Sequence, residues 1–248
     1  MLVKADTSRV LLIAALRDEL SACVRRLALK RGSACFEGAS NGRTITAATI
    51  GVGAIQAELA ARRLIERHRP SALILIGFSG GLDNTLNVAD AVHPLCVVDG
   101  ASRLYHLTPT APPQPGDAAA PRDSSTAVLS ANHVITLAQE KRQLGELHRA
   151  CAVDMESFAI AGLACELRLP LRIVRAISDP ADIDLPPQVA TWINADGSPR
   201  IGAAIASLLR RPTLLPAMLK LRNHTRAAAD RLAIEVETML RSGGAPTG

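Results

Sequence analysis

The sequence reads Ala152-Val153-Asp154-Met155-Glu156-Ser157, and about twenty residues later it reads Val174-Arg175-Ala176-Ile177-Ser178-Asp179. This pattern predicts that Glu156 stands at the start of a helix and that Asp179 stands just past the end of the next apolar strand. Two acidic side chains at neighbouring strand ends can divide sugar chemistry between them. One holds the sugar, and the other protonates a leaving group.

Outward from these segments, apolar or β-branched runs alternate with stretches of helical spacing. The expected strands are residues 10–16, 44–50, 72–76, 92–98, 126–130 and 171–177. The expected helices are residues 18–29, 54–68, 156–167, 201–210 and 216–240. The alternation predicts an α/β fold, with a mostly parallel sheet covered on both faces and one domain over residues 1–248.

Glycine and proline mark the breaks in this pattern. Gly77, Gly80 and Gly81 are expected to end the third strand, and the segment 109–125, rich in Pro, Ala, Gly and Asp, predicts a loop over a site. Gly51-Val52-Gly53 lacks the third glycine of a dinucleotide fingerprint, because Gln56 stands in its place. Ser79 lies in a glycine-rich turn without the ordered acid and histidine of a serine hydrolase.

Composition excludes several classes of protein. Hydrophobic residues make up 48% of the chain, charged residues 21% and aromatic residues only 2%, so the core is expected to be aliphatic. Few aromatics leave few platforms for stacking bases, which argues against a nucleic-acid surface. The five cysteines and six histidines are scattered without metal-ligand spacing. We therefore expect no metal, no cofactor and reduced thiols in a cytoplasmic protein.

The net charge of +5 belongs to the C-terminal region. From Arg200 onward there are eight Lys or Arg residues and three Asp or Glu residues, so the preceding residues are neutral overall. No apolar run approaches the roughly 20 residues that a membrane span needs. The apolar run at 10–16 is followed by Arg17-Asp18-Glu19 rather than by a small-residue cleavage site, so no signal peptide is expected.

Four features are expected at the carboxyl edge of the sheet, where open α/β sheets bind ligands. They are Glu19, the turn at Gly51-Val52-Gly53, the segment 77–81, and Asp179 with Glu156. Taken singly, each acid has a simpler interpretation. Glu19 is then a solvated first-turn acid, Glu156 complements a helix dipole, and Asp179 is a turn residue beside Pro180.

Together these segments resemble the purine nucleoside phosphorylase/methylthioadenosine–adenosylhomocysteine nucleosidase superfamily. The resemblance spans roughly residues 10–182 and rests on Ala14–Leu20, Gly51–Gly53, Gly77–Asp83, Val153–Glu156 and Arg175–Asp179. It implies a three-layer phosphorylase/hydrolase-like α/β fold with a mixed, mostly parallel central sheet flanked by helices. It also implies an enzyme that cleaves an N-glycosidic bond and works as a homo-oligomer.

The resemblance also implies the roles of individual residues. Asp179, helped by Ser178, is expected to protonate N7 of a purine, and Glu19 to activate water. Glu156 and Met155 are expected to hold the ribose hydroxyls. Further substrate-binding positions are Phe78, Ser79, Gly80, Gly53, Val134 and Ile135.

Phosphorylases of this superfamily open with Pro-Gly-Asp and a nearby arginine, whereas this chain has Ala15-Leu16-Arg17-Asp18-Glu19. A carboxylate there repels phosphate, which favours hydrolysis. Arg17, Arg43 or Arg175 could still supply a phosphate site, and phosphate is then a co-substrate.

Two departures from the nucleosidase pattern predict a more apolar pocket. Phe78 replaces a small polar residue, and Val134 falls where the nucleosidases carry a base-stacking aromatic. Both departures put the ordinary substrates, methylthioadenosine and adenosylhomocysteine, in doubt.

The C-terminal part resembles the hopanoid-associated phosphorylase subfamily, which implies adenosylhopane, an adenine nucleoside with a lipid tail, as the substrate. That resemblance rests on Leu185-Pro186-Pro187, Asn194-Ala195-Asp196-Gly197, Ser207–Pro212 and Leu215-Pro216-Ala217. Leucines from 208 to 221, interleaved with basic residues, could contact an anionic membrane and make the protein peripheral to the inner membrane. The alternative, favoured by breaks at Pro212 and Pro216, is packing on the core or on a second subunit.

One interpretation from another class remains, a non-catalytic relative that binds a nucleoside or a lipid. A pure binding site has no need for acids suited to protonation and water activation. Three carboxylates that meet in one cavity favour the enzyme, and scattered carboxylates favour the binding protein.

Overall fold

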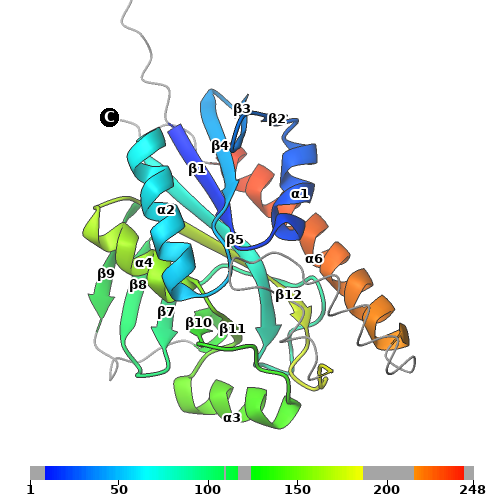
Figure 1. Ribbon diagram of the computed structural model, residues 1–248. Helices are drawn as coiled ribbons and strands as arrows, with labels where there is room; N and C mark the ends of the chain where they lie inside the picture. The colour runs from blue at the N-terminus through cyan, green and yellow to red at the C-terminus, as the bar shows by residue number, and fades with distance from the viewer. Residues whose placement is uncertain (1–8, 109, 117–123, 187–214, 243–248) are drawn as a thin grey trace, which may run out of the picture.

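The computed structural model describes residues 9–108, 110–116, 124–186 and 215–242 (Figure 1). The strands are β1 (Arg9–Ala14), β2 (Lys30–Arg31), β3 (Phe36–Ser40), β4 (Arg43–Thr49), β5 (Ala72–Gly81), β6 (Ala91–Val92), β7 (Cys96–Asp99), β8 (Leu104–Thr108), β9 (Ala111–Gly116), β10 (Ala127–Ser130), β11 (Ala152–Asp154) and β12 (Leu171–Asp179). The helices are α1 (Arg17–Arg26), α2 (Ala54–His68), α3 (Ala138–His148), α4 (Ser157–Glu166) and α6 (Leu215–Ser242), with a short 3₁₀ turn at Ser124–Thr126.

All of these strands belong to one mixed sheet. Its order is β2-β3-β4-β1-β5-β11-β10-β7-β8-β9, and β12 pairs with β5 and with β6. Parallel pairing joins β4 to β1, β1 to β5, β5 to β12, β7 to β10 and β10 to β11. The β5–β11 pair and the outer strands on both sides are antiparallel. The carboxyl ends of β5 and β12 reach the same edge, near α3 (Figure 1).

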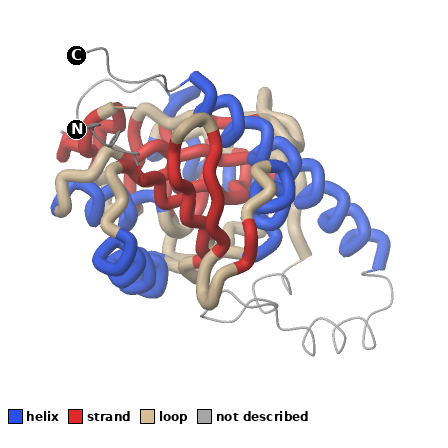
Figure 2. Tube along the Cα trace, turned by 90° about the horizontal axis from the view of Figure 1, so that it is seen from above, coloured by secondary structure: helices blue, strands red, loops and turns tan. Residues whose placement is uncertain are grey.

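Helices cover the sheet on both faces, which confirms the predicted α/β class with a mixed sheet (Figure 2). Small and branched residues of α2 and α4, among them Ala57, Ala61 and Ile160, form one core with β1, β5 and β12. Residues of α1 and α6, among them Leu20 and Leu232, form the core on the other face. Burial of these aliphatic side chains supplies the main driving force for the fold.

The two longest predicted helices are present. The bounds of α2 match the prediction, because Arg69 adopts a left-handed conformation with φ of 45° and donates its N–H to the Ile65 carbonyl, just before Pro70. Pro216 is the second residue of α6. A proline is tolerated there because the N–H groups of the first helical turn have no acceptor within the helix. The predicted helix 201–210 lies outside the described residues.

The second half of α6 packs on the core rather than extending into solvent. Ala228, Leu232 and Val236 are buried against α1 and β12, whereas Leu219 is half exposed. The choice between membrane contact and packing, which concerned the leucines from 208 to 221, stays a prediction. The segments 187–214, which include Leu208, Leu209 and Pro212, lie outside the described residues. Over the part of the chain that is described, no helix is long and apolar enough to cross a bilayer.

The glycines of the third strand do not break it, contrary to the prediction. Strand β5 runs through Gly77, Gly80 and Gly81 to its end. Their function is steric, because a Cβ on Gly77 would overlap Nη1 of Arg175, and a Cβ on Gly80 would lie 3.1 Å from an Asp179 carboxylate oxygen. The glycines thus let charged side chains approach the strand closely.

Two further predictions of local structure were wrong. The expected strand 92–98 is split into β6 and β7, because Pro94 cannot donate to a ladder. Part of the expected loop 109–125 forms β9, which pairs with β8 at the edge of the sheet. Prolines 112, 113 and 115 are tolerated there because one side of an edge strand needs no partner.

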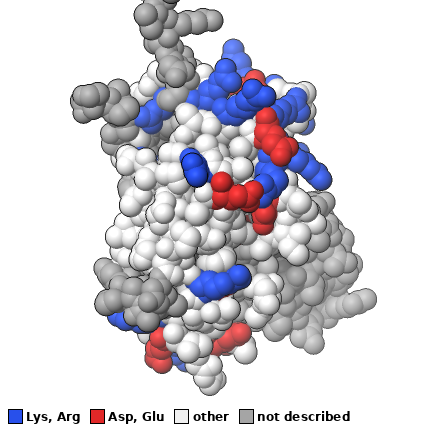
Figure 3. All heavy atoms as spheres, turned by 90° about the vertical axis from the view of Figure 1, so that its left-hand side faces the viewer, with Lys and Arg blue, Asp and Glu red and all other residues white. Residues whose placement is uncertain are grey.

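Charged side chains are unevenly distributed on the face shown in Figure 3. Lys and Arg gather there with Asp and Glu at the upper end and again at the lower end, and uncharged surface separates smaller charged patches between them. The neighbouring helix α2 exposes Ile55 and Leu59. Formation of a homo-oligomer stays a prediction.

We predict that Gly77→Ala lowers the free energy of unfolding by at least about 2 kcal/mol. The new methyl group would displace the Arg175 guanidinium, which is wholly buried and already held by Asp154 and Ser157. Urea unfolding monitored by circular dichroism measures the effect. Gly100→Ala is the control, because its Cβ would meet nothing within 4 Å. Equal stability of the two variants would show that Arg175 has room to move.

Candidate active site

A cavity of about 230 Å³ opens at the carboxyl edge of the sheet. It brings together ten of the eleven residues predicted for the site, namely Glu19, Phe78, Ser79, Gly80, Val134, Ile135, Met155, Glu156, Ser178 and Asp179. Gly53 does not line the cavity, but its backbone N–H donates to a Glu156 carboxylate oxygen at 2.8 Å. The three predicted acids therefore converge on one cavity, as expected for an enzyme.

Glu19 is held in the first turn of α1 by two backbone donors. The N–H of Leu16 donates to Oε2 at 2.7 Å, and the N–H of Phe78 donates to Oε1 at 2.8 Å. Only 4% of the residue is exposed, so the interpretation as a solvated acid is wrong. Burial raises the pKa of Glu19 to about 7, although the two N–H groups and Arg175 oppose the rise. Glu19 can therefore exchange a proton near neutral pH.

Glu156 precedes α4 but does not cap it, because its side chain makes no cap hydrogen bond to that helix. It points instead to Gly53, whose φ of 88° turns the chain into α2. Burial and then the neighbouring Asp154 raise the pKa of Glu156 to about 8, while Arg175 and the Gly53 N–H oppose the rise. A carboxylate with one free oxygen at the cavity wall can accept hydrogen bonds from hydroxyl groups.

Asp179 ends β12, and both of its carboxylate oxygens are bonded. The Ser178 hydroxyl donates to Oδ1 at 2.7 Å, and the Lys141 ammonium donates to Oδ2 at 2.6 Å. Burial raises the pKa of Asp179, and Lys141, Ser178 and His224 oppose that rise. These contacts argue against a mere turn residue beside Pro180, because a turn needs no buried ion pair.

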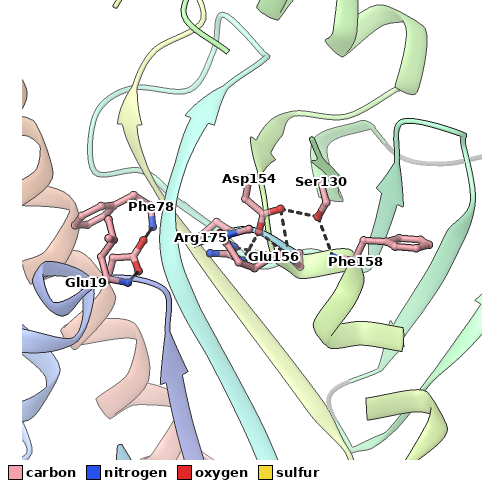
Figure 4. A network of polar contacts seen from close by, with 10 residues as sticks. Glu19, Phe78, Ser130, Asp154, Glu156, Phe158 and Arg175 are labelled. Carbon is pink, nitrogen blue, oxygen red and sulfur yellow. Dashed lines mark hydrogen bonds and ion pairs between the residues drawn. The ribbon is translucent and has the colours of Figure 1, made fainter. Parts of the chain in front are cut away.

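The wholly buried Arg175 interacts electrostatically with several acids of the site. Arg175 forms an ion pair with Asp154, and its Nη2 donates to the Ser157 hydroxyl at 2.9 Å. Figure 4 shows Arg175 between Glu19 on one side and Asp154 with Ser130 on the other. Asp154 also accepts from the Ser130 hydroxyl at 2.6 Å, and Ser130 in turn accepts from the N–H of Phe158. This network joins β10, β11, β12 and the start of α4.

The cavity wall is acidic and otherwise mostly apolar. Asp154 joins the three predicted acids there, and no Lys or Arg is among the described residues that line it. The remaining wall comes from Ala15, Leu16, Val52, His133, Val153, Leu185, Leu221 and Thr225. Within the described residues, no group of three or more His, Cys, Asp or Glu could hold a metal ion.

The sequence prediction missed two contributions to this site. Lys141 lies on the buried stripe of α3 with Ala138 and His148, and a lysine at such a spacing was the available signal. Leu221 and Thr225 come from α6, far along the chain, and nothing local indicated their position.

Comparisons with known proteins show which family model this chain matches and which solved structures share its fold. The family model described as "Phosphorylase superfamily" matches residues 2–211. A 5′-methylthioadenosine/S-adenosylhomocysteine nucleosidase of Psychromonas ingrahamii is 28% identical over 170 residues, which cover 60% of this chain and 73% of that protein.

Two solved structures from Helicobacter pylori, each 13% identical, share the fold. One is a mutant of the nucleosidase MTAN with 5′-methylthioadenosine in its active site; it has a TM-score of 0.67 and covers 94% of this chain and 98% of its own. The other is futalosine hydrolase, which has a TM-score of 0.68 and covers 96% of this chain and 99% of its own.

We predict that Glu156→Gln stabilises the protein at alkaline pH. The pKa of Glu156 is raised by folding, so the folded chain binds a proton that the unfolded chain releases above its own pKa of roughly 4.5. Ionisation of the buried carboxyl group therefore lowers the free energy of unfolding increasingly as pH rises, and this loss reaches its full value above about 8. The glutamine keeps the Gly53 contact without a charge. We expect a gain of about 1–3 kcal/mol at pH ~9 that disappears towards pH ~4.

Thermal unfolding across pH checks this expectation, with Glu166→Gln as the control on the same helix. Glu166 is exposed and paired with Arg62, which lowers its pKa, so its replacement should give no gain at any pH. An unchanged melting temperature of Glu156→Gln at high pH would contradict the cost of this buried charge.

Proposed function

The chain belongs to the phosphorylase superfamily, and from that membership we propose that it hydrolyses the N-glycosidic bond of an adenine nucleoside. One observation carries the proposal. Three buried carboxylates whose pKa values are all raised line one cavity at the carboxyl edge of the sheet. Raised carboxyl pKa values in a cleft are typical of groups that exchange protons during catalysis.

Asp179 would act as the acid. Its proton would pass to N7 of the purine, and the electron pair of the bond between C1′ and N9 would move into the ring, so that the base leaves as a neutral molecule. The sugar would then carry the positive charge of an oxocarbenium-like state. Ser178 donates to the same carboxylate and would keep it aimed at the base.

Glu156 and Met155 would bind the ribose. The free carboxylate oxygen of Glu156 accepts hydroxyl donors, and its negative charge stabilises the positive sugar. Glu19 would take a proton from the water that attacks C1′, and its pKa of about 7 suits a base at neutral pH. The two-carboxylate logic parallels that of glycoside hydrolysis.

The charges of the cavity support water rather than phosphate as the nucleophile. A phosphate dianion needs cations, yet the described wall holds four carboxylates and no Lys or Arg. Arg175 is committed to Asp154, Arg17 is exposed, and Arg43 begins β4 at the opposite end of that strand. Phosphorolysis by a true nucleoside phosphorylase is the less supported reaction.

Adenosylhopane is the substrate that we propose, with adenine and ribosylhopane as products. The resemblance of the C-terminal part to the hopanoid-associated subfamily supports it, as does the apolar wall formed by Phe78, Val134, Leu185 and Leu221. Methylthioadenosine or adenosylhomocysteine, which appear in the name of the P. ingrahamii relative, is the second candidate.

The first experiment measures adenine release by chromatography from methylthioadenosine, adenosylhomocysteine and adenosylhopane, each with and without phosphate. We expect release from adenosylhopane without phosphate. Release that requires phosphate would make the enzyme a phosphorylase and remove Glu19 from the mechanism. Release of no adenine from any of the three would contradict the proposal and favour the binding protein.

We predict that Asp179→Asn lowers kcat by at least about a hundredfold, because an amide cannot protonate N7. Glu146→Gln on the exposed surface of α3 is the matched control and should retain full activity. Circular dichroism must show that both variants are folded. Activity of Asp179→Asn near that of the wild type would rule out the acid role.

We also predict that kcat/KM rises with pH through about 7. Glu19 works as a base only when ionised, so activity is lost as pH falls through its pKa. Glu156 must also ionise to accept from the ribose, and its pKa of about 8 extends the rise. Glu19→Gln should lower kcat by about 10²–10⁴. The loss of activity at low pH should disappear or move in Glu19→Gln, and a loss at the same pH in Glu19→Gln and in the wild type would contradict the role of Glu19.

A further inference from the structure

Lys141 is a charged residue with no exposed surface, and it lies on α3, a helix that the sequence analysis did not predict. It is the fourth residue of α3 and is wholly buried. Its ammonium donates to Oδ2 of Asp179 at 2.6 Å, to the Pro180 carbonyl at 2.9 Å and to the Ile183 carbonyl at 3.1 Å. The ammonium has three N–H donors, and each has an acceptor.

This arrangement fits the charged form of lysine and no apolar substitute. A buried ammonium is tolerated only when it is paired and fully hydrogen-bonded, which three oxygens achieve here. A hydrophobic residue would leave an ionised Asp179 buried without its counter-charge, and would also leave two carbonyls without donors. An ion pair that served stability alone would not need to involve Asp179, the acid at the cavity wall.

Other groups face Asp179 from every side, and none duplicates Lys141. From β12, the Ser178 hydroxyl donates to the other carboxylate oxygen. From α6, Nδ1 of His224 lies 3.2 Å from the Ser178 carbonyl and acts on Asp179 only through its charge. Glu19, Asp154 and Glu156 line the same cavity but make no described hydrogen bond or ion pair with Asp179.

Lys141 also connects the acid to the apolar wall. Two further contacts join α3 to the segment after β12: the N–H of Ala138 donates to Asp184 at 2.7 Å, and the N–H of Leu185 donates to the Thr136 carbonyl at 2.8 Å. Leu185 and Ile135, which flank this junction, line the cavity. The lysine thus supplies the ion pair in a set of contacts that holds Asp179 beside this apolar wall.

Resting on the proposed function, we propose that Lys141 is a positioning residue that acts through Asp179. It fixes the carboxyl group towards the base, and it stabilises the carboxylate that remains after proton transfer. In that step the O–H bond of Asp179 breaks, an N–H bond forms at N7, and the electron pair of the glycosidic bond passes to the purine. The ammonium keeps all of its protons.

Lys141→Met tests the proposal, with Lys141→Gln as a polar variant should methionine prevent folding. Removing the cation makes Asp179 a weaker acid, so kcat should fall about ten- to a hundredfold while KM changes less than about threefold. Asp179 is active only when protonated, so activity falls at high pH as this group ionises. In Lys141→Met this alkaline limb of the pH–activity profile should move up by about one to three pH units. Arg142→Met, an exposed neighbour on α3, removes one positive charge and should change neither value.

Asp184→Asn separates positioning from simple anchoring. It weakens the contact between α3 and the segment after β12 but leaves the Lys141–Asp179 pair intact. We expect the alkaline limb of the pH–activity profile of Asp184→Asn to match that of the wild type. An unshifted limb in Lys141→Met, or an equal shift in Asp184→Asn, would overturn the proposal.

A second readout does not depend on any substrate. Carbon-13 NMR of labelled aspartate side chains, with the Asp179 signal identified by its loss in Asp179→Asn, measures the titration of this carboxyl group directly. The titration midpoint should rise by about one to three pH units in Lys141→Met. An unchanged midpoint would overturn the role of Lys141 even in an active enzyme. A shifted midpoint in a protein that releases no adenine would instead refute the proposed function.

Discussion

The buried ion pair between Arg175 and Asp154 is the constraint on which the centre of the molecule depends. Arg175 has no exposed surface, so its charge must be met inside the protein, and Asp154 on the neighbouring strand meets it. The pair requires a residue without a side chain at Gly77 and fixes Ser157 at the start of α4. Its two charges also act on Glu19 and Glu156 in opposite directions. One contact therefore connects the close packing of the strands with the electrostatics of the site.

Much of this arrangement could be predicted from the sequence, because it follows from local pattern. The bounds of α2 follow from its amphipathic spacing and from the residues that end it. The meeting of Glu19 and Asp179 follows from the shared edge of the parallel strands β1, β5 and β12. Glu156 follows β11, which is antiparallel to β5, so its position depends on a pairing that the expected parallel sheet did not include. The function of the glycines in β5 could not be predicted, because it depends on Arg175, which comes from a strand almost a hundred residues later. Lys141 contacts Asp179 from behind the cavity wall, and its place on the buried stripe of α3 was the one local signal; α6 reaches the cavity through packing that the local sequence does not indicate.

The negatively and positively charged side chains of the site lie at different depths from the cavity surface. Carboxylates line the wall, while the cations that balance two of them, Lys141 and Arg175, lie behind and are themselves fully buried. A neutral nucleoside would meet negative groups where positive charge develops on the sugar, whereas an anionic nucleophile would be repelled. Such a site is costly for the fold, since burial raises the pKa of all three acids. Sites of this kind are retained for function at the expense of stability.

Helix α6 contributes to the cavity without contributing an acid. Leu221 and Thr225 line the wall, His224 touches the carbonyl of Ser178, and the rest of the helix is anchored on α1 and β12. Reactive groups thus come from strand ends and the helices that follow them, while one late helix shapes the space around the substrate. A change at Leu221 or Thr225 would therefore alter the shape of the cavity while leaving the three acids in place, whereas a change at His224 would also alter the charge that acts on Asp179.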